Sequence, residues 1–95
     1  MSKEIVWTDT TGQTDYANVL DSTGQWYNTG TVAFEAFNAA HWTNYAITGT
    51  EYGSSGVYEA DMPAVTAATY SLVARRRAGG SPAQSDATVG TGSPA

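Results

Sequence analysis

Apolar and polar residues alternate with a two-residue period in several short segments of this chain, and Gly, Asn, Ser, Thr or Pro separates the segments. This pattern is typical of short β-strands joined by turns, because successive side chains of a strand point to opposite faces. Strands are predicted at residues 4–8, 14–21, 25–27, 31–37, 45–50, 57–62 and 69–77. We therefore expect an all-β sandwich or barrel of about seven short antiparallel strands.

Two local signals locate connections between these strands. Asp21 and Gly24 hold the first and last positions of a type I turn, which predicts a hairpin between residues 14–21 and 25–27. Asn38 is expected to cap one short helical turn over residues 39–42, which would connect two sheets.

The segment at residues 57–62 alternates clearly enough to predict its two faces. The inward set is Tyr58, Ala60 and Met62, and the outward set is Val57, Glu59 and Asp61. The strand at 69–77, with Tyr70, Leu72 and Ala74 on one face, is predicted to be its pairing partner.

The composition changes after Ala78, where Gly, Ser and Pro become frequent. We expect a β-sandwich domain at residues 1–78 and an extended C-terminal arm at residues 79–95, with an edge strand at 86–89. Such an arm is expected to lie across a neighbouring subunit and to become ordered there.

Size and composition restrict the class of protein. The chain has 95 residues, enough for one domain, and its 41% hydrophobic and 14% charged residues are not those of a disordered chain. It has no Cys, which excludes disulfides, thiolate metal sites and cysteine nucleophiles. The net charge of −5 argues against nucleic acid as a partner. No signal peptide or membrane-spanning segment is recognisable, so no membrane association is expected.

The residues that could carry chemistry are few. His41 is the only histidine, lies between Ala40 and Trp42, and is interpreted as a structural residue. Asp9, Asp15 and Asp21 lack the spacing of a calcium loop and are interpreted as solvated turn residues. We therefore predict no enzyme activity, no metal and no cofactor.

Three consecutive arginines, Arg75, Arg76 and Arg77, end an otherwise uncharged strand. Alternation places Arg75 and Arg77 on one face and Arg76 on the other. Their partners are acidic groups either within the chain or on a neighbouring subunit, since arginine is favoured at both kinds of site. The candidate internal partners are Glu35, Glu59 and Asp61.

Large aromatic residues are the second candidate for binding. Trp7, Trp26 and Trp42 are not expected to fit together inside so small a sandwich, so at least one should lie near an interface or under the C-terminal arm. The predicted partner-binding residues are Arg75, Arg76, Arg77, Trp26, Tyr27 and Trp7.

Several segments resemble a small domain found in bacteriophage structural proteins. They are YANVLDSTGQWYN at 16–28, AFEAF at 33–37, NYAIT at 44–48, GVY at 56–58, DMPA at 61–64, TYSLV at 69–73, AGGSPA at 78–83 and VG at 89–90. They also resemble, more loosely, transthyretin-like and other immunoglobulin-like sandwiches. The resemblance implies a single immunoglobulin-like β-sandwich.

The same resemblance implies a non-enzymatic virion protein: a capsid decoration or cement subunit, a head fibre, or a neck or tail accessory subunit. Such a protein would be made in the host cytoplasm, associate with itself and bind other virion subunits. The alternative is a carbohydrate-binding module that uses Trp26 and Tyr27, or Tyr52 with the loop at 53–55. The two readings differ in whether the aromatic residues enter a subunit interface or form an open row.

Overall fold

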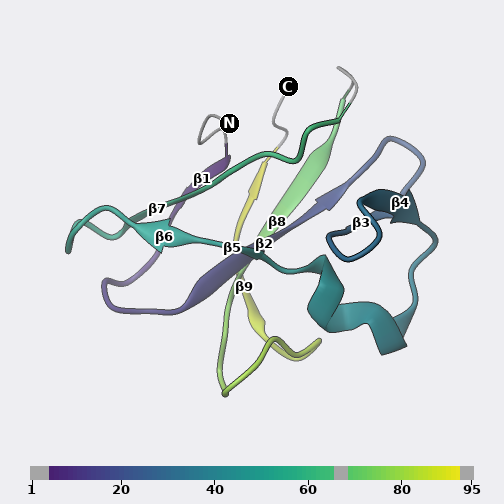
Figure 1. The fold of residues 1–95 in the computed structure, drawn as a ribbon. Helices are drawn as coiled ribbons and strands as arrows, with labels where there is room; N and C mark the ends of the chain where they lie inside the picture. The colour runs from purple at the N-terminus through teal and green to yellow at the C-terminus, as the bar shows by residue number, and fades with distance from the viewer. Residues whose placement is uncertain (1–4, 66–68, 93–95) are drawn as a thin grey trace.

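The computed structural model describes residues 5–65 and 69–92. Within them the chain forms nine short antiparallel strands in two sheets and one 3-10 helix (Figure 1). The elements are β1 Ile5–Thr8, β2 Asp15–Leu20, β3 Trp26–Asn28, β4 Ala33–Glu35, η1 Ala39–Tyr45, β5 Ile47–Thr48, β6 Thr50–Glu51, β7 Val57–Ala60, β8 Ser71–Arg76 and β9 Ala87–Gly92. The all-β, sandwich-like architecture is confirmed. The number of strands exceeds the predicted seven because segment 45–50 contributes both β5 and β6, and because β9 is a full strand.

The smaller sheet has the order β1-β7-β6, and the larger sheet has the order β4-β3-β2-β8-β9, with β5 also paired to β2. The predicted pairing of segments 57–62 and 69–77 is wrong. β7 pairs with β1 and β6 in the smaller sheet, whereas β8 lies between β2 and β9 in the larger one. The connection between β7 and β8 therefore crosses from one sheet to the other, and their apolar faces meet across the core instead of sharing an edge.

The predicted hairpin between β2 and β3 is confirmed, with Leu20 opposite Trp26. Asp21 organises the turn, because its Oδ1 accepts hydrogen bonds from the backbone N–H of Thr23 at 2.9 Å and of Gln25 at 3.0 Å. Gly24 closes the turn with a φ of 83°, a conformation that favours glycine. These local bonds explain why this connection could be recognised from the sequence.

The predicted cap at Asn38 is also confirmed, since its Oδ1 accepts a hydrogen bond from the N–H of Ala40 at 3.0 Å. The helix is longer than the single turn expected and runs to Tyr45, which was predicted to start a strand. The reason is that the side chains of Trp42 and Tyr45 are buried against β2 and β3, and this packing extends the helix.

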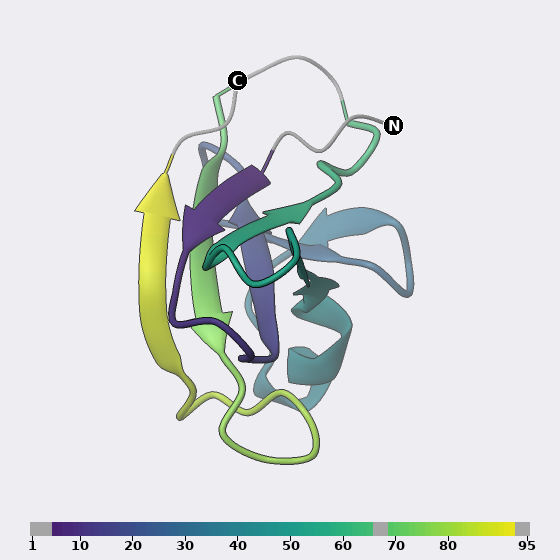
Figure 2. The same cartoon turned by 90° about the vertical axis from the view of Figure 1, so that its left-hand side faces the viewer.

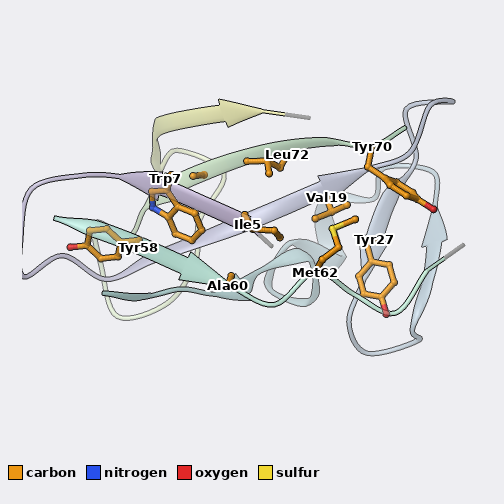
Figure 3. Packing of buried hydrophobic residues seen from close by; sticks show 11 residues of the cluster. Ile5, Trp7, Val19, Tyr27, Tyr58, Ala60, Met62, Tyr70 and Leu72 are labelled. Carbon is orange, nitrogen blue, oxygen red and sulfur yellow. The ribbon is translucent and has the colours of Figure 1, made fainter. Parts of the chain in front are cut away.

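The main core lies between the two sheets. Figure 3 shows side chains of β1 and β7 facing those of β2, β3 and β8 across this space. Trp7 and Tyr58 stack with ring centroids 6.0 Å apart and an interplanar angle of 8°. Tyr58, Ala60 and Met62 are buried in this core, as predicted. Glu59, predicted to face solvent, is buried as well, because β7 is the middle strand of its sheet and has β1 and β6 on either side.

A second, smaller core lies on the opposite face of the larger sheet. β2 is buried on both faces: Ala17 and Val19 enter the main core, while Tyr16 packs with Trp42 and Tyr45. Two cores give the tryptophans more room than one sandwich interior. Trp7 and Trp42 are therefore each buried in a different core and Trp26 is only partly buried, so the three tryptophans do not share one sandwich interior, as expected.

The segment that follows β8 returns to the larger sheet. Figure 2 shows β9 (yellow) as the edge strand beside β8, with β1 close to it. Val89 packs against the main core and lies at a β-bulge, since Gly90 is opposite Ala74 and Thr88 is opposite Arg75. The edge strand expected at residues 86–89 thus overlaps the start of a longer strand, Ala87–Gly92, which pairs with its own chain.

Candidate functional site

The three consecutive arginines are directed to different places. Arg75 lies on the helix side of the larger sheet, where its Nε donates to Asn18 Oδ1 at 2.8 Å and its guanidinium carbon lies 5.1 Å from the centre of the Trp42 ring. Its Nη1 also donates to the backbone oxygen of Asp86 at 3.3 Å. This side chain holds the second core and the β8–β9 loop together.

Arg76 lies at the end of the sandwich, where its Nε donates to Asp9 Oδ2 at 3.0 Å and its Nη2 pairs with Asp9 Oδ1. Arg77 donates from Nε to the backbone oxygen of Gly79 at 3.0 Å. The triplet therefore does not form one basic patch. The bonded partners of Arg75 and Arg76 differ from the acids predicted, because the β1–β2 loop brings Asp9 close to Arg76 and the β8–β9 loop brings Asp86 close to Arg75.

Two of the predicted aromatic residues belong to the main core. Trp7 is buried and donates from Nε1 to Asp15 Oδ2 at 2.9 Å. Tyr27 is buried and meets Phe34 edge to face, with centroids 5.3 Å apart. Of the three aromatic candidates, only Trp26 lies in the second core and is partly exposed.

The side chains around Trp26 form what we call the aromatic face: Trp26, Phe37, Trp42 and Tyr45, with Glu35 and His41 at its border. The Trp26 ring centre lies 5.1 Å from that of Phe37, 5.5 Å from that of Trp42 and 5.4 Å from that of Tyr45. Phe37 is the outermost member, with 46% of its surface exposed. β3, the segment after β4 and η1 each contribute to this face, which is why its members are separated in the sequence.

Glu35 provides the polar border of the aromatic face. Its Oε2 accepts a hydrogen bond from the Tyr45 hydroxyl at 2.5 Å and lies 2.7 Å from His41 Nδ1. The hydrogen bond from Tyr45, and then that from His41, hold the pKa of Glu35 below its ordinary value. Burial, together with the Glu35 carboxylate, raises the pKa of Tyr45. Glu35 is thus an oriented, ionised acceptor beside exposed apolar surface.

Phe37, Trp42 and Tyr45 are the aromatic members of this surface that are absent from the predicted partner-binding residues. Phe37 was predicted to end the strand at residues 31–37, but β4 stops at Glu35 and Phe37 follows in a connection, where alternation does not indicate a face. The available signal was the concentration of Phe37, Trp42 and Tyr45 around the predicted cap at Asn38. Three aromatic residues within a short polar segment exceed what one helical turn can bury.

Other kinds of site can be tested against the part of the chain that the structure covers. No group of three His, Cys, Asp or Glu side chains that could hold a metal ion occurs among residues 5–65 and 69–92. No helix within the same ranges is long and apolar enough to cross a membrane.

Comparisons of the chain with protein-family models, with curated proteins and with solved structures gave no match. The resemblance to small domains of bacteriophage structural proteins therefore stays a prediction from the sequence. The aromatic face and its place in the fold are the structural features that indicate a function.

Proposed function

We propose that this chain is a non-enzymatic binding module that docks on a neighbouring protein through the aromatic face. The observation that carries the proposal is the partial exposure of Trp26 and Phe37 on a surface already organised by Trp42 and Tyr45. Aromatic residues and Arg are enriched at the centres of protein interfaces, and Arg75 lies over Trp42 in this cluster.

The aromatic face is well prepared for binding because its side chains are already immobilised. Phe37 packs against three rings, with centroids 5.1 Å from Trp26, 6.2 Å from Trp42 and 6.0 Å from Tyr45. A side chain that is ordered before association loses little entropy when a partner covers it. Burial of Phe37 by a partner should therefore contribute to the binding free energy with little loss of side-chain entropy.

The finer assignment follows from the sequence resemblance. It makes this module an immunoglobulin-like accessory subunit of a virion, such as a capsid decoration, head-fibre, neck or tail protein, which binds other virion subunits and itself. The sandwich-like fold is compatible with that role. A particle would supply many copies of the neighbouring surface, so a weak single contact could be strengthened by multivalency.

A carbohydrate-binding module is the second candidate, and a specific observation favours it. The rings that contact Phe37 are Trp26, Trp42 and Tyr45, while nearly half of Phe37 is open to solvent beside Glu35 and His41. A sugar can stack on an exposed ring and donate hydroxyl hydrogen bonds to a neighbouring carboxylate.

The deciding experiment is to measure the mass and composition of the native material that contains the chain. Light scattering and mass spectrometry would give the stoichiometry of any particle. A defined copy number in a particle supports the accessory-subunit proposal. A free monomer that is retained on polysaccharide would overturn it in favour of the glycan-binding alternative.

A variant then tests the surface itself. Phe37→Ala is expected to weaken incorporation into the particle by about 30-fold or more, because truncating an interface hot spot typically costs about 2 kcal/mol or more. Tyr52→Ala is the matched control, since Tyr52 is an aromatic residue of similar exposure, 53%, in the β6–β7 loop. Equal incorporation of both variants and the unmodified protein would contradict a role for the aromatic face.

A further inference from the structure

Two aspartates, Asp9 and Asp15, lie at the end of the sandwich with the arginine Arg76 as their positively charged neighbour. Arg76 pairs with Asp9 and stands opposite Asp15 in the pairing of β2 with β8, and each aspartate affects the pKa of the other. Asp15 is only 2% exposed, and its Oδ2 accepts the hydrogen bond from Trp7. Both carboxyl groups are therefore structural parts of the fold, contrary to the prediction that they are solvated turn residues.

The other carboxyl oxygen of Asp15, Oδ1, is unusual because it is buried and lacks a hydrogen-bond donor in the described part of the chain. A buried, ionised carboxylate oxygen without a donor is costly, whereas a protonated carboxyl group can itself donate. A proton on Asp15 would allow it to donate to Asp9, so that the pair carries one negative charge opposite the one positive charge of Arg76.

Asp9 begins the β1–β2 loop, residues 9–14, and Asp15 begins the strand after it. This loop is attached to the smaller sheet by a few polar contacts. Asp9 N donates to Gly56 O at 2.9 Å, and the Tyr58 hydroxyl donates to Thr10 O at 2.8 Å. The Tyr58 oxygen also accepts from Gln13 N at 3.0 Å. A second negative charge on Asp9 and Asp15 would repel the first and so weaken the attachment of this loop at Asp9.

We propose that Asp9 and Asp15 form a proton-sharing clamp that holds the β1–β2 loop against the β6–β7 hairpin in weakly acidic solution and loosens it toward neutral pH. Asp9 is the member that belongs to the loop: its own side chain is 3% exposed, but its Arg76 partner is 39% exposed and the loop residues after it are mostly exposed. Asp15 remains fixed by Trp7 and by its place in β2.

The electrostatic surroundings agree with this geometry. Burial first, and then the Asp9 carboxylate, raise the pKa of Asp15 to about 6 against the opposing effects of Trp7 and Arg76. The hydrogen bond from Arg76 is the main cause that lowers the pKa of Asp9. Within the described residues, Tyr58 from β7 also acts on the pair, and Glu51 from β6, which accepts from Gly12 N in the same loop, adds no positive charge.

The sign of the pH effect follows from the proton balance. Asp15 binds its proton more tightly in the folded protein than at the ordinary pKa of 3.8, so the stability that it contributes is complete below pH 3.8. This contribution is lost as the pH rises to about 6 and stays lost above it. The corresponding change in the folding equilibrium constant is on the order of 100-fold.

The first test uses the unmodified protein and needs no variant to fold. Carboxyl ¹³C NMR should show Asp15 titrating near pH 6, and the amide of Gln13 should exchange with solvent faster at pH 7.5 than at pH 5 after correction for intrinsic exchange. An Asp15 titration near pH 4, or a protection factor for Gln13 that is independent of pH, would overturn the proposal.

The second test removes the titration and keeps the shape. Asp15→Asn retains an acceptor for Trp7 and supplies an amide donor to Asp9 at every pH, so its unfolding equilibrium should lose the change between pH 4 and 7. Asp61→Asn is the matched control, since it removes one exposed acidic charge and should keep the pH dependence of the unmodified protein. Identical pH profiles for Asp15→Asn and the unmodified protein would refute the clamp.

Discussion

Val32 is a residue whose backbone conformation conflicts with its side chain. It has a φ of 58°, which is a strained value for a β-branched residue, and its side chain is 68% exposed. Asn28 imposes this conformation, because its backbone oxygen accepts from Val32 N at 2.8 Å while its Oδ1 accepts from Gly30 N at 2.8 Å. The hydrogen bonds of Asn28 thus maintain the tight β3–β4 turn and hold the backbone of Val32 in a strained conformation.

Replacing Val32 by Gly should therefore stabilise the protein. Relief of backbone strain outweighs the entropy that Gly adds to the unfolded chain, and a gain of about 1 kcal/mol is expected. Val6→Gly is the matched control, since Val6 is 55% exposed within β1 and the same substitution there should cost about 1 kcal/mol. Urea unfolding of both variants measures the difference, and a loss of stability in Val32→Gly would show that the turn is not strained.

At the scale of elements, β9 depends on Asp86. The Asp86 Oδ2 accepts from the Tyr16 hydroxyl at 2.6 Å and from Ala83 N at 2.9 Å, and Oδ1 accepts from Ala78 N at 3.1 Å. Burial alone would raise the pKa of Asp86, but these three hydrogen bonds outweigh it and hold the pKa below 3.8. This carboxylate therefore anchors the β8–β9 loop to β2.

Asp86→Asn should lower the free energy of unfolding by about 1–2 kcal/mol at neutral pH, because an amide cannot accept all three hydrogen bonds. The pKa of Asp86 is lowered on folding, so its contribution is present above pH 3.8 and is lost as the pH falls through the lower, folded value. The variant should accordingly lose less stability on acidification than the unmodified protein.

Thermal unfolding between pH 2 and 7 measures this difference. Tyr16→Phe serves as a graded comparison, since it removes one donor to Asp86 and keeps the carboxylate. A smaller loss is expected for Tyr16→Phe than for Asp86→Asn. Equal acid sensitivity in Asp86→Asn and the unmodified protein would mean that the carboxylate does not anchor the loop.

At the scale of the whole molecule, the segment 79–92 belongs to the domain, because it ends in β9, a strand of the larger sheet. β9 pairs with β8 along its length, Val89 contacts the main core, and a Cβ at Gly90 would lie 3.3 Å from the Cβ of Trp7. Removing the chain after Gly79 would expose the edge of β8 and leave Arg75 without its contact to Asp86. We therefore expect stability to depend on this segment.

The fragment 1–79 should lose roughly 3 kcal/mol or more of unfolding free energy, or fail to fold, because both sheet pairing and core packing are removed. Circular dichroism and urea unfolding test this expectation. Val89→Ser in the full chain should give an intermediate loss through the core contact alone. A fragment as stable as the full chain would instead support an arm that becomes ordered only on a neighbouring subunit.

The sequence determined those features whose causes lie within a few residues. Alternation located most strands and the inward face of β7, Asp21 and Gly24 specified a hairpin, and Asn38 specified a helix start. Each of these depends on side-chain direction or on a short hydrogen bond that the local chain supplies. The place of Trp26 in a strand was predicted for the same reason, since Trp26 begins the strand that returns from this hairpin.

Only the tertiary structure decided which strands pair and which side chains meet. Alternation indicates the face of a strand but not its neighbour, because the backbone groups at a strand edge are the same for every sequence. The choice of β1 over β8 as the partner of β7 was therefore open. Long-range packing also placed η1 over the second face of β2 and brought Asp9 against Asp15. For this reason the aromatic face and the buried carboxyl pair emerged from the fold, not from the sequence pattern.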